Sequence, residues 1–388
     1  MQEPISLYLH IPFCRAICTY CAFNTYANMD DSIEPFVQAL LAELNYIARD
    51  QPRIPLKTVF FGGGTPSMLS IAQLKRILAT IRQEFALVPY AEISLEANPN
   101  DLNLAYLQGL MSVGVNRLSL GMQSADEREL IMYGRQHTNS MVAQAVQDAH
   151  AVGLNNISLD LIFGNPYQTL EQWEQTLKQA LSYAPAHISL YGLEVKGGTA
   201  LKAQMMRGDL PSPDDDLAAD MYQLAEDLLE EAGLQHYEIS NWAKMGYEAQ
   251  HNLQYWHNRP YVGVGAGAHG YVNNVRTIVT RLPQRYIHAM QYSTQSQRAF
   301  PRTPATSKAV LVTRENEITE TLMTGLRLTR EGVSRESFME RFGIDLVAEY
   351  RQRLERLVAL GMIEVTETAV RLTRAGRFIS NRVISELL

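Results

Sequence analysis

Short segments that alternate apolar and polar residues recur through the first half of this 388-residue chain and constrain its fold most. Four of them share an Ile-Ser-Leu or Leu-Ser-Leu core and are separated by sequence of helical period: residues 92–96, 117–121, 156–160 and 187–191. Two further β-rich segments precede them, at residues 6–11 and 58–61. Strands that alternate with helices form βα units around a parallel sheet. Six such units predict an α/β fold, a partial (β/α)6 barrel of the TIM type.

Side chains along a strand alternate between its two faces, so the polar positions of these segments share one face. We expect that face to line the barrel interior, while the alternate isoleucines and leucines pack under the helices. Glu96, Gln123 and Asp160 lie towards the carboxyl ends of their strands, where barrel active sites are built. Each alone could be a buried polar residue satisfied by its neighbours. Three on one interior favour ligand binding.

All three cysteines of the chain, Cys14, Cys18 and Cys21, lie in one loop after the first strand, at spacing C-x3-C-x2-C. The odd count in a long chain argues against a disulfide framework. Soft thiolates at this spacing suit an iron–sulfur cluster, or a zinc ion for which His10 would supply the fourth ligand. Three inert buried thiols are a further alternative. A four-iron cluster would keep one iron without a cysteine ligand.

The cysteine loop, with Tyr20 before its last cysteine, resembles the cluster motif of the radical S-adenosylmethionine (SAM) superfamily. The run from Gly62 to Pro66, Gly-Gly-Gly-Thr-Pro, resembles that superfamily's glycine motif, and residues 6–14 resemble its anaerobic coproporphyrinogen oxidase-like family. The resemblance implies a [4Fe–4S] cluster held by the three cysteines, with SAM chelating the open iron. The residues that match family positions around SAM are Tyr8, Tyr20, Gly63, Gly64, Thr65, Glu96, Gln123, Arg135 and Asp160.

Residues 249–314 contain no Asp or Glu but carry eight Lys and Arg residues, although the whole chain has a net charge of −7. Such a segment would attract an anionic partner, or it could cover an acidic surface of the barrel. It contains Gly265–Gly270, which fits G-x-G-x-x-G, but no acidic residue follows about 20 positions later. We therefore reject a dinucleotide site there.

The run from His251 to Trp256, His-Asn-Leu-Gln-Tyr-Trp, resembles a motif of the HemW-type heme chaperones, where it is associated with heme binding. An imidazole is an ordinary axial ligand of heme iron. His251 is therefore the first candidate for this ligand and His269 the second. The alternative for His251 is a histidine that is hydrogen-bonded within a loop.

Two features favour the HemW type over the oxidase within this family. The oxidase has a further cysteine two residues after the last ligand, where this chain has Phe23, and a long extension before the cluster, where this chain has thirteen residues before Cys14. The predicted function is a heme chaperone that binds a [4Fe–4S] cluster, SAM and heme and hands heme to an acceptor protein. The alternative is oxygen-independent coproporphyrinogen III oxidase of porphyrin biosynthesis, so enzyme activity stays undecided.

The chain is expected to have three parts: a radical SAM partial barrel at 1–245, a basic connecting segment at 246–314, and a helical, winged-helix-like domain at 315–388. A predicted hairpin at 362–365 and 369–372 would form the wing. The acidic total argues against nucleic acid binding, and no apolar run is long enough for stable membrane insertion. Cluster-type thiols predict the cytoplasm. We expect a monomer or dimer.

Overall fold

A computed structural model describes residues 3–49 and 52–388. The chain divides into two compact units: unit 1 consists of Met1–Ala225 and Pro260–Leu311, and unit 2 of Glu226–Arg259 and Val312–Leu388. The basic segment expected at 246–314 is therefore shared between the units, with most of it in unit 1. The domain boundaries expected at residues 245 and 314 stay a prediction.

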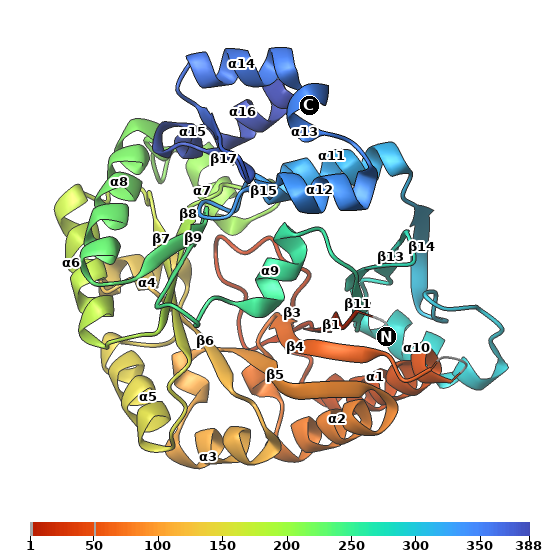
Figure 1. Ribbon diagram of the computed structural model, residues 1–388. Helices are drawn as coiled ribbons and strands as arrows, with labels where there is room; N and C mark the ends of the chain where they lie inside the picture. The colour runs from red at the N-terminus through yellow and green to blue at the C-terminus, as the bar shows by residue number, and fades with distance from the viewer. Residues whose placement is uncertain (1–2, 50–51) are drawn as a thin grey trace. The chain divides into compact units, whose positions relative to one another are not determined.

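Unit 1 is built on six parallel strands that lie side by side in chain order (Figure 1). They are β1 (Ile5–Ile11), β4 (Pro55–Gly63), β5 (Ala86–Ala97), β6 (Arg117–Gln123), β7 (Ile157–Phe163) and β8 (His187–Gly192). Parallel strands in consecutive order, each followed by a helix, are the arrangement of a (β/α) barrel. The predicted fold class, a partial (β/α)6 barrel, is confirmed.

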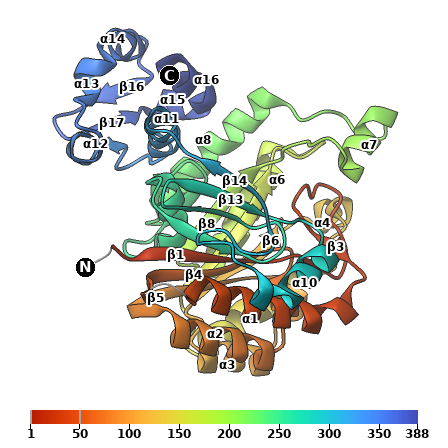
Figure 2. The same ribbon diagram turned by 90° about the vertical axis from the view of Figure 1, so that its right-hand side faces the viewer.

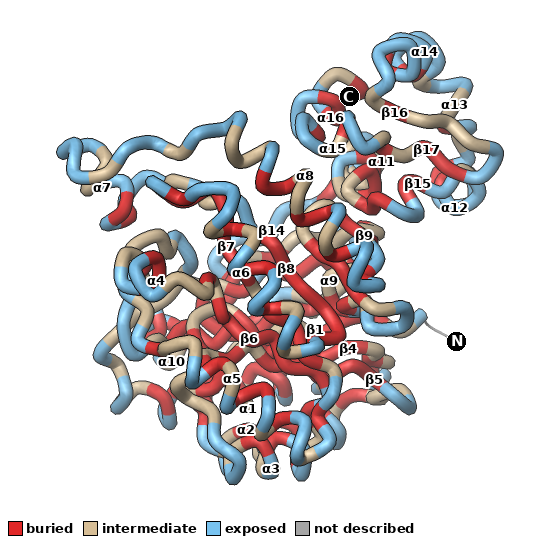
Figure 3. The backbone as a smooth tube through the Cα atoms, turned by 90° about the vertical axis from the view of Figure 1, so that its left-hand side faces the viewer, coloured by how far each residue is buried: buried red, intermediate tan, exposed pale blue. Residues whose placement is uncertain are grey.

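The helices of unit 1 cover the outer side of this sheet (Figures 1 and 2). They are α1 (Ile33–Ala48), α2 (Ile71–Glu84), α3 (Leu104–Val113), α4 (Glu127–Tyr133), α5 (Asn139–Ala151), α6 (Leu170–Ser182), the first part of α8 (Asp215–Glu231), and α10 (Pro283–Gln291). In contrast, α7 (Ala200–Arg207) lies on an arm that extends away from the sheet (Figure 2). Capping boxes at Ser70 and Thr169 define the starts of α2 and α6. Figure 3 shows strands buried along most of their length and helices exposed on one side.

The alternation read from the sequence agrees with burial in the sheet. Leu95, Leu120 and Leu159 are fully buried on the helix side. The opposite parity contributes Glu96 and Asp160 to the wall of a cavity. Along each barrel strand, successive side chains therefore point alternately to the helix layer and to the cavity.

Four more strands extend the sheet beyond β1: β11 (Tyr261–Val264), β12 (His269–Val272), β13 (Val275–Val279) and β14 (Thr306–Leu311). The first is parallel to β1 and the others are antiparallel in turn. Glu43 of α1 connects this extension to the helical layer. Its buried carboxylate accepts hydrogen bonds from the amide of Gly265 at 2.9 Å and the hydroxyls of Tyr286 at 2.8 Å and Thr303 at 2.7 Å.

Unit 2 is mainly helical and contains the wing that the sequence predicts. Its helices are α9 (Gln250–Trp256), α11 (Arg314–Gly325), α12 (Arg335–Phe342), α13 (Leu346–Glu349), α14 (Arg351–Ala359), α15 (Arg374–Phe378) and α16 (Ser380–Leu387). Its strands are β9 (Gln235–Glu238), β10 (Asn241–Ala243), β15 (Val333–Ser334), β16 (Ile363–Val365) and β17 (Ala369–Leu372). The antiparallel pairing of β16 with β17 confirms the hairpin. Every helix within 3–49 and 52–388 is too short or too polar to span a bilayer.

Candidate functional site

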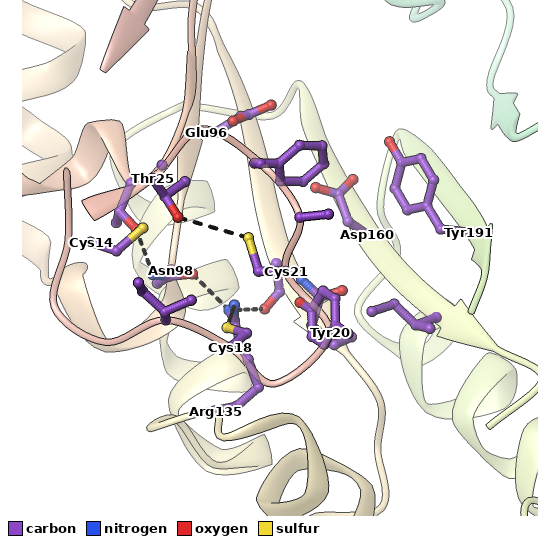
Figure 4. Close-up of a pocket in the computed structure, with 18 of the residues that line it drawn as sticks. Cys14, Cys18, Tyr20, Cys21, Thr25, Glu96, Asn98, Arg135, Asp160 and Tyr191 are labelled. Atoms are coloured by element: carbon purple, nitrogen blue, oxygen red, sulfur yellow. Dashed lines mark hydrogen bonds between the residues drawn. The ribbon is translucent and has the colours of Figure 1, made fainter. Parts of the chain in front are cut away.

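A cavity of about 370 Å³ lies at the carboxyl ends of the unit 1 strands (Figure 4). Eleven of the predicted site residues line it: Cys14, Cys18, Tyr20, Cys21, Gly63, Gly64, Thr65, Glu96, Gln123, Arg135 and Asp160. They come from the loop after β1, from the ends of β4 to β7 and from the segment after α4. The structure therefore brings together residues up to 146 positions apart in the chain, as the shared strand parity predicts.

A chain of hydrogen bonds connects two of the cysteine sulfurs. Thr65 Oγ1 donates to Cys14 Sγ at 3.3 Å and accepts from Asn98 Nδ2 at 3.3 Å. Arg135 donates through Nη2 to Asn98 Oδ1 at 2.6 Å and through Nη1 to Cys18 Sγ at 3.6 Å. Donors directed at sulfur stabilise a thiolate, which is the form that binds metal.

The three cysteines are free and partly buried. Burial raises the pKa of the Cys14 thiol to about 11, and it also raises the pKa of Cys21. Both are therefore protonated at neutral pH unless a metal displaces the proton, as metal sites generally do.

The donor chemistry suits a cluster, since three soft cysteine sulfurs come from one loop. A zinc ion needs its sulfur ligands about 2.3 Å from one point, whereas cysteines on a cluster each bind a different iron. His10, the fourth ligand considered for zinc, is engaged with Tyr8 Oη at 2.9 Å and the Asn24 carbonyl at 3.0 Å. The donor set therefore fits an iron–sulfur cluster with three cysteine ligands.

The glycine turn after β4 is shaped by contacts that exclude larger residues. Gly63 has a φ of +115°, and a Cβ there would lie 2.6 Å from the ring of His10. At Gly64 a Cβ would lie 2.6 Å from the carbonyl oxygen of Phe13, in the cysteine loop. The turn thus lies directly against the cysteine loop, and only glycine permits both its conformation and this approach.

Two carboxyl groups lie on the wall of the cavity. Glu96 accepts a hydrogen bond from the Gly63 amide at 3.0 Å, and burial raises its pKa to about 7. Asp160 accepts from Ser119 at 2.9 Å and from Ser158 at 3.2 Å, and burial raises its pKa as well. Carboxylates with raised pKa values in a cavity are typical of ligand-binding and catalytic sites.

Two predicted site residues lie elsewhere. Tyr8 does not line the cavity. Its hydroxyl is hydrogen-bonded to His10, and its ring stacks on that of Phe60 with 6.1 Å between the ring centres. His251 belongs to α9 of unit 2, is 1% exposed, and has Nε2 2.8 Å from Tyr255 Oη. It is therefore not among the residues that line the unit 1 cavity.

Several lining residues were missed by the sequence analysis. Asn98, which connects Thr65 with Arg135, is two positions beyond Glu96 and could have been found by extending the same strand parity. Phe23 and Tyr191 also line the cavity, with 73% and 45% of their surface exposed. Tyr191 comes from the end of β8, the one of the six barrel strands to which no site residue had been assigned.

Comparison with known proteins gives matches along the chain. Residues 8–180 match the radical SAM superfamily and residues 312–379 match the HemN C-terminal domain. The heme chaperone HemW of Bacillus subtilis is 39% identical over 388 residues, covering 99% of each chain. That of Escherichia coli is 39% identical over 301 residues, covering 75% of this chain and 78% of its own.

Among solved structures, coproporphyrinogen III oxidase (HemN) from Escherichia coli, described as a radical SAM enzyme, superposes with a TM-score of 0.83. The match covers 100% of this chain and 90% of the oxidase, at 22% identity. At this level of identity the likeness concerns the fold.

Proposed function

Since the chain belongs to the radical SAM superfamily and, within it, to the HemW family, we propose that it is a heme chaperone. It binds a [4Fe–4S] cluster, SAM and heme, and it transfers heme to an acceptor protein. The observation that carries this proposal is the 39% identity to a heme chaperone along 99% of both chains. Phe23, in place of the oxidase's additional cysteine, points the same way.

Cys14, Cys18 and Cys21 would hold the cluster, which when bound offers an iron to the amino and carboxylate groups of SAM. The surrounding residues have separate tasks. Thr65 and Arg135 donate hydrogen bonds to two of the sulfurs. Gly63, Gly64, Glu96, Gln123 and Asp160 form the wall against which SAM would lie. A carboxylate that accepts from serine hydroxyls, as Asp160 does, can instead accept from the hydroxyls of a ribose.

For heme, the sequence motif proposes that His251 would hold the iron, with His269 as the second candidate. His251 is buried and its Nε2 lies within hydrogen-bonding distance of Tyr255. To bind iron through this nitrogen, α9 would have to give up that contact and expose the ring. A heme chaperone has to release its heme, so the side chain that binds the iron must be able to let it go. The hydrogen bond between His251 and Tyr255 would compete with iron binding, which is compatible with the proposal.

We place the protein in the cytoplasm, because three cluster-binding thiols require a reducing compartment. Its partner is a heme acceptor protein, and neither nucleic acid nor a membrane is part of the proposal. The acidic chain, with a net charge of −7, is unsuited to binding nucleic acid.

Anaerobic reconstitution of the full chain tests the proposal. We expect about four irons per chain, SAM binding, a Soret band on hemin titration, and transfer of the bound heme to an apo-globin trap. The same preparation should be given coproporphyrinogen III, SAM and a reductant. Absence of the Soret band would refute heme binding, and formation of protoporphyrinogen with carbon dioxide would identify the oxidase instead.

A further inference from the structure

The end of α4 presents carbonyl groups to the cysteine loop. The helix stops at Gly134, whose φ of +70° turns the chain away from the helix axis. The last carbonyls of any helix have no partner within it. Thr19, in the middle of the cysteine loop, occupies two of them. Its amide donates to the Tyr133 carbonyl at 2.9 Å, and its hydroxyl donates to the Met132 carbonyl at 2.7 Å.

The carbonyl of Thr19 meets the end of a second helix. It accepts a hydrogen bond from the amide of Leu201 at 2.8 Å. Leu201 lies in the first turn of α7, where amides have no acceptor within the helix, and its side chain is fully buried. The amide, hydroxyl and carbonyl of Thr19 are therefore all paired with the open ends of two helices. This one residue fixes the loop to both.

The same end of α4 also reaches a sulfur of the loop. The amide of Arg135 donates to the Leu130 carbonyl of α4 at 2.9 Å, which holds the backbone of Arg135 against the helix. Its guanidinium donates through Nη1 to Cys18 Sγ at 3.6 Å (Figure 4). Cys18 directly precedes Thr19 in the chain. The end of α4 thus contacts two consecutive residues of the loop, one through carbonyl groups and one through a cation.

The contact between Arg135 and Cys18 depends on how the loop sits on α4, because the two residues are 117 positions apart. The hydrogen bonds of Thr19 fix that position. A cluster becomes more negative when it takes up an electron, and a cationic donor beside a ligand sulfur stabilises this charge. Hydrogen bonds to the sulfurs are among the factors that set the reduction potential of a cluster.

We propose that Thr19 is a positioning residue of the cluster site, which holds Cys18 Sγ against Arg135 and thereby raises the reduction potential of the bound cluster. The inference rests on the cluster of the proposed function. Because all three polar groups of Thr19 are directed at helix ends, Thr19 acts on the cluster through Arg135 and not by contact with iron.

Two substitutions isolate the hydroxyl of Thr19. Thr19→Val removes it and keeps the shape of the side chain, whereas Thr19→Ser keeps it. In the anaerobically reconstituted full chain, Thr19→Val should shift the reduction potential to a more negative value and change the electron paramagnetic resonance spectrum of the reduced cluster. Thr19→Ser should reproduce wild type. The matched control is Thr138→Val, since Thr138 is also half-buried, pairs with Ser140 Oγ at 2.8 Å and does not line the cavity. A wild-type potential in Thr19→Val would overturn the inference.

A double substitution tests the route. Arg135→Gln removes the cationic donor and should also lower the potential. If Thr19 acts through Arg135, Thr19→Val should cause no further shift in the Arg135→Gln chain. A merely structural role for Thr19 would shift the potential equally in both backgrounds, and that result would refute the inference.

Hydrogen–deuterium exchange of the apo-protein tests the link without a cluster. Thr19→Val should raise exchange at least tenfold in residues 14–25 and 199–208, and leave peptides of β4 to β7 unchanged, which establishes that the barrel is folded. Wild-type exchange in both segments would contradict the inference. Failure of the wild-type chain to take up iron would instead refute the cluster of the proposed function, and the exchange result would still decide the role of Thr19.

Discussion

Replacing Glu43 should destabilise unit 1 strongly, although this residue lies outside the cavity. Glu43 is fully buried, and its carboxylate accepts hydrogen bonds from Gly265, Tyr286 and Thr303. In Glu43→Ala the Thr303 hydroxyl can turn to Thr306 Oγ1 at 3.4 Å, but the Gly265 amide and Tyr286 hydroxyl lose their acceptor. Each buried donor left unsatisfied costs about 1–3 kcal/mol. With two such donors, the expected loss in the free energy of unfolding is about 2–6 kcal/mol.

Urea unfolding followed by far-UV circular dichroism measures this loss, and hydrogen–deuterium exchange locates it. Exchange should increase in peptides from 260–306, which carry all three donors. Glu34→Ala is the matched control, since Glu34 lies on the same helix and also has three side-chain partners, Gln38, Gln73 and Arg76, but is exposed. Exposed pairs contribute about 0–1 kcal/mol. Equal losses in the two variants would refute the argument from burial.

Three further predictions concern the cavity. Because burial raises the pKa of Glu96 to about 7, the stability that its protonated carboxyl contributes is present at acid pH and is lost as pH rises through 7. In urea unfolding of the apo-protein, wild type should therefore lose stability relative to Glu96→Gln between pH 5 and 8. A difference that stays constant over this range would contradict the prediction. Cys18→Ala should lower the iron content to below one atom per chain by metal analysis, and retention of four irons would exclude the cysteine assignment. Gly63→Ala should weaken SAM binding at least tenfold in equilibrium dialysis, because Gly63 has a φ of +115° and an added Cβ would meet the ring of His10. Gly197 has open space around it, so Gly197→Ala should leave the affinity for SAM unchanged.

Much of the cavity could be predicted from the sequence because strand alternation is a local property. Glu96, Gln123 and Asp160 were placed on one interior by counting in twos, and all three line the cavity. The same procedure could have found Asn98, but it could not have shown what Asn98 contacts. Asn98 continues the parity of β5 past the end of its strand, and its importance rests on contacts with Thr65 and Arg135, which are remote in sequence.

The histidines could not be ranked from the sequence. A motif identifies His251 as a candidate, yet burial and the contact with Tyr255 engage its ring, whereas His269 is exposed beside Arg276. Exposure and hydrogen-bond partners depend on which segments cover a residue, and that information is not carried by spacing along the chain.

The sequence by itself determined the (β/α)6 architecture, the cysteine loop and the side of the sheet on which ligands would bind. These follow from periods of two and 3.6 residues and from ligand spacing within eight positions, all of which are local. Only the tertiary structure decided which donors reach the sulfurs and that Glu43 connects to residues 222 to 260 positions away. Those outcomes depend on contacts between distant segments, whose partners are fixed only when the strands pair and the helices pack.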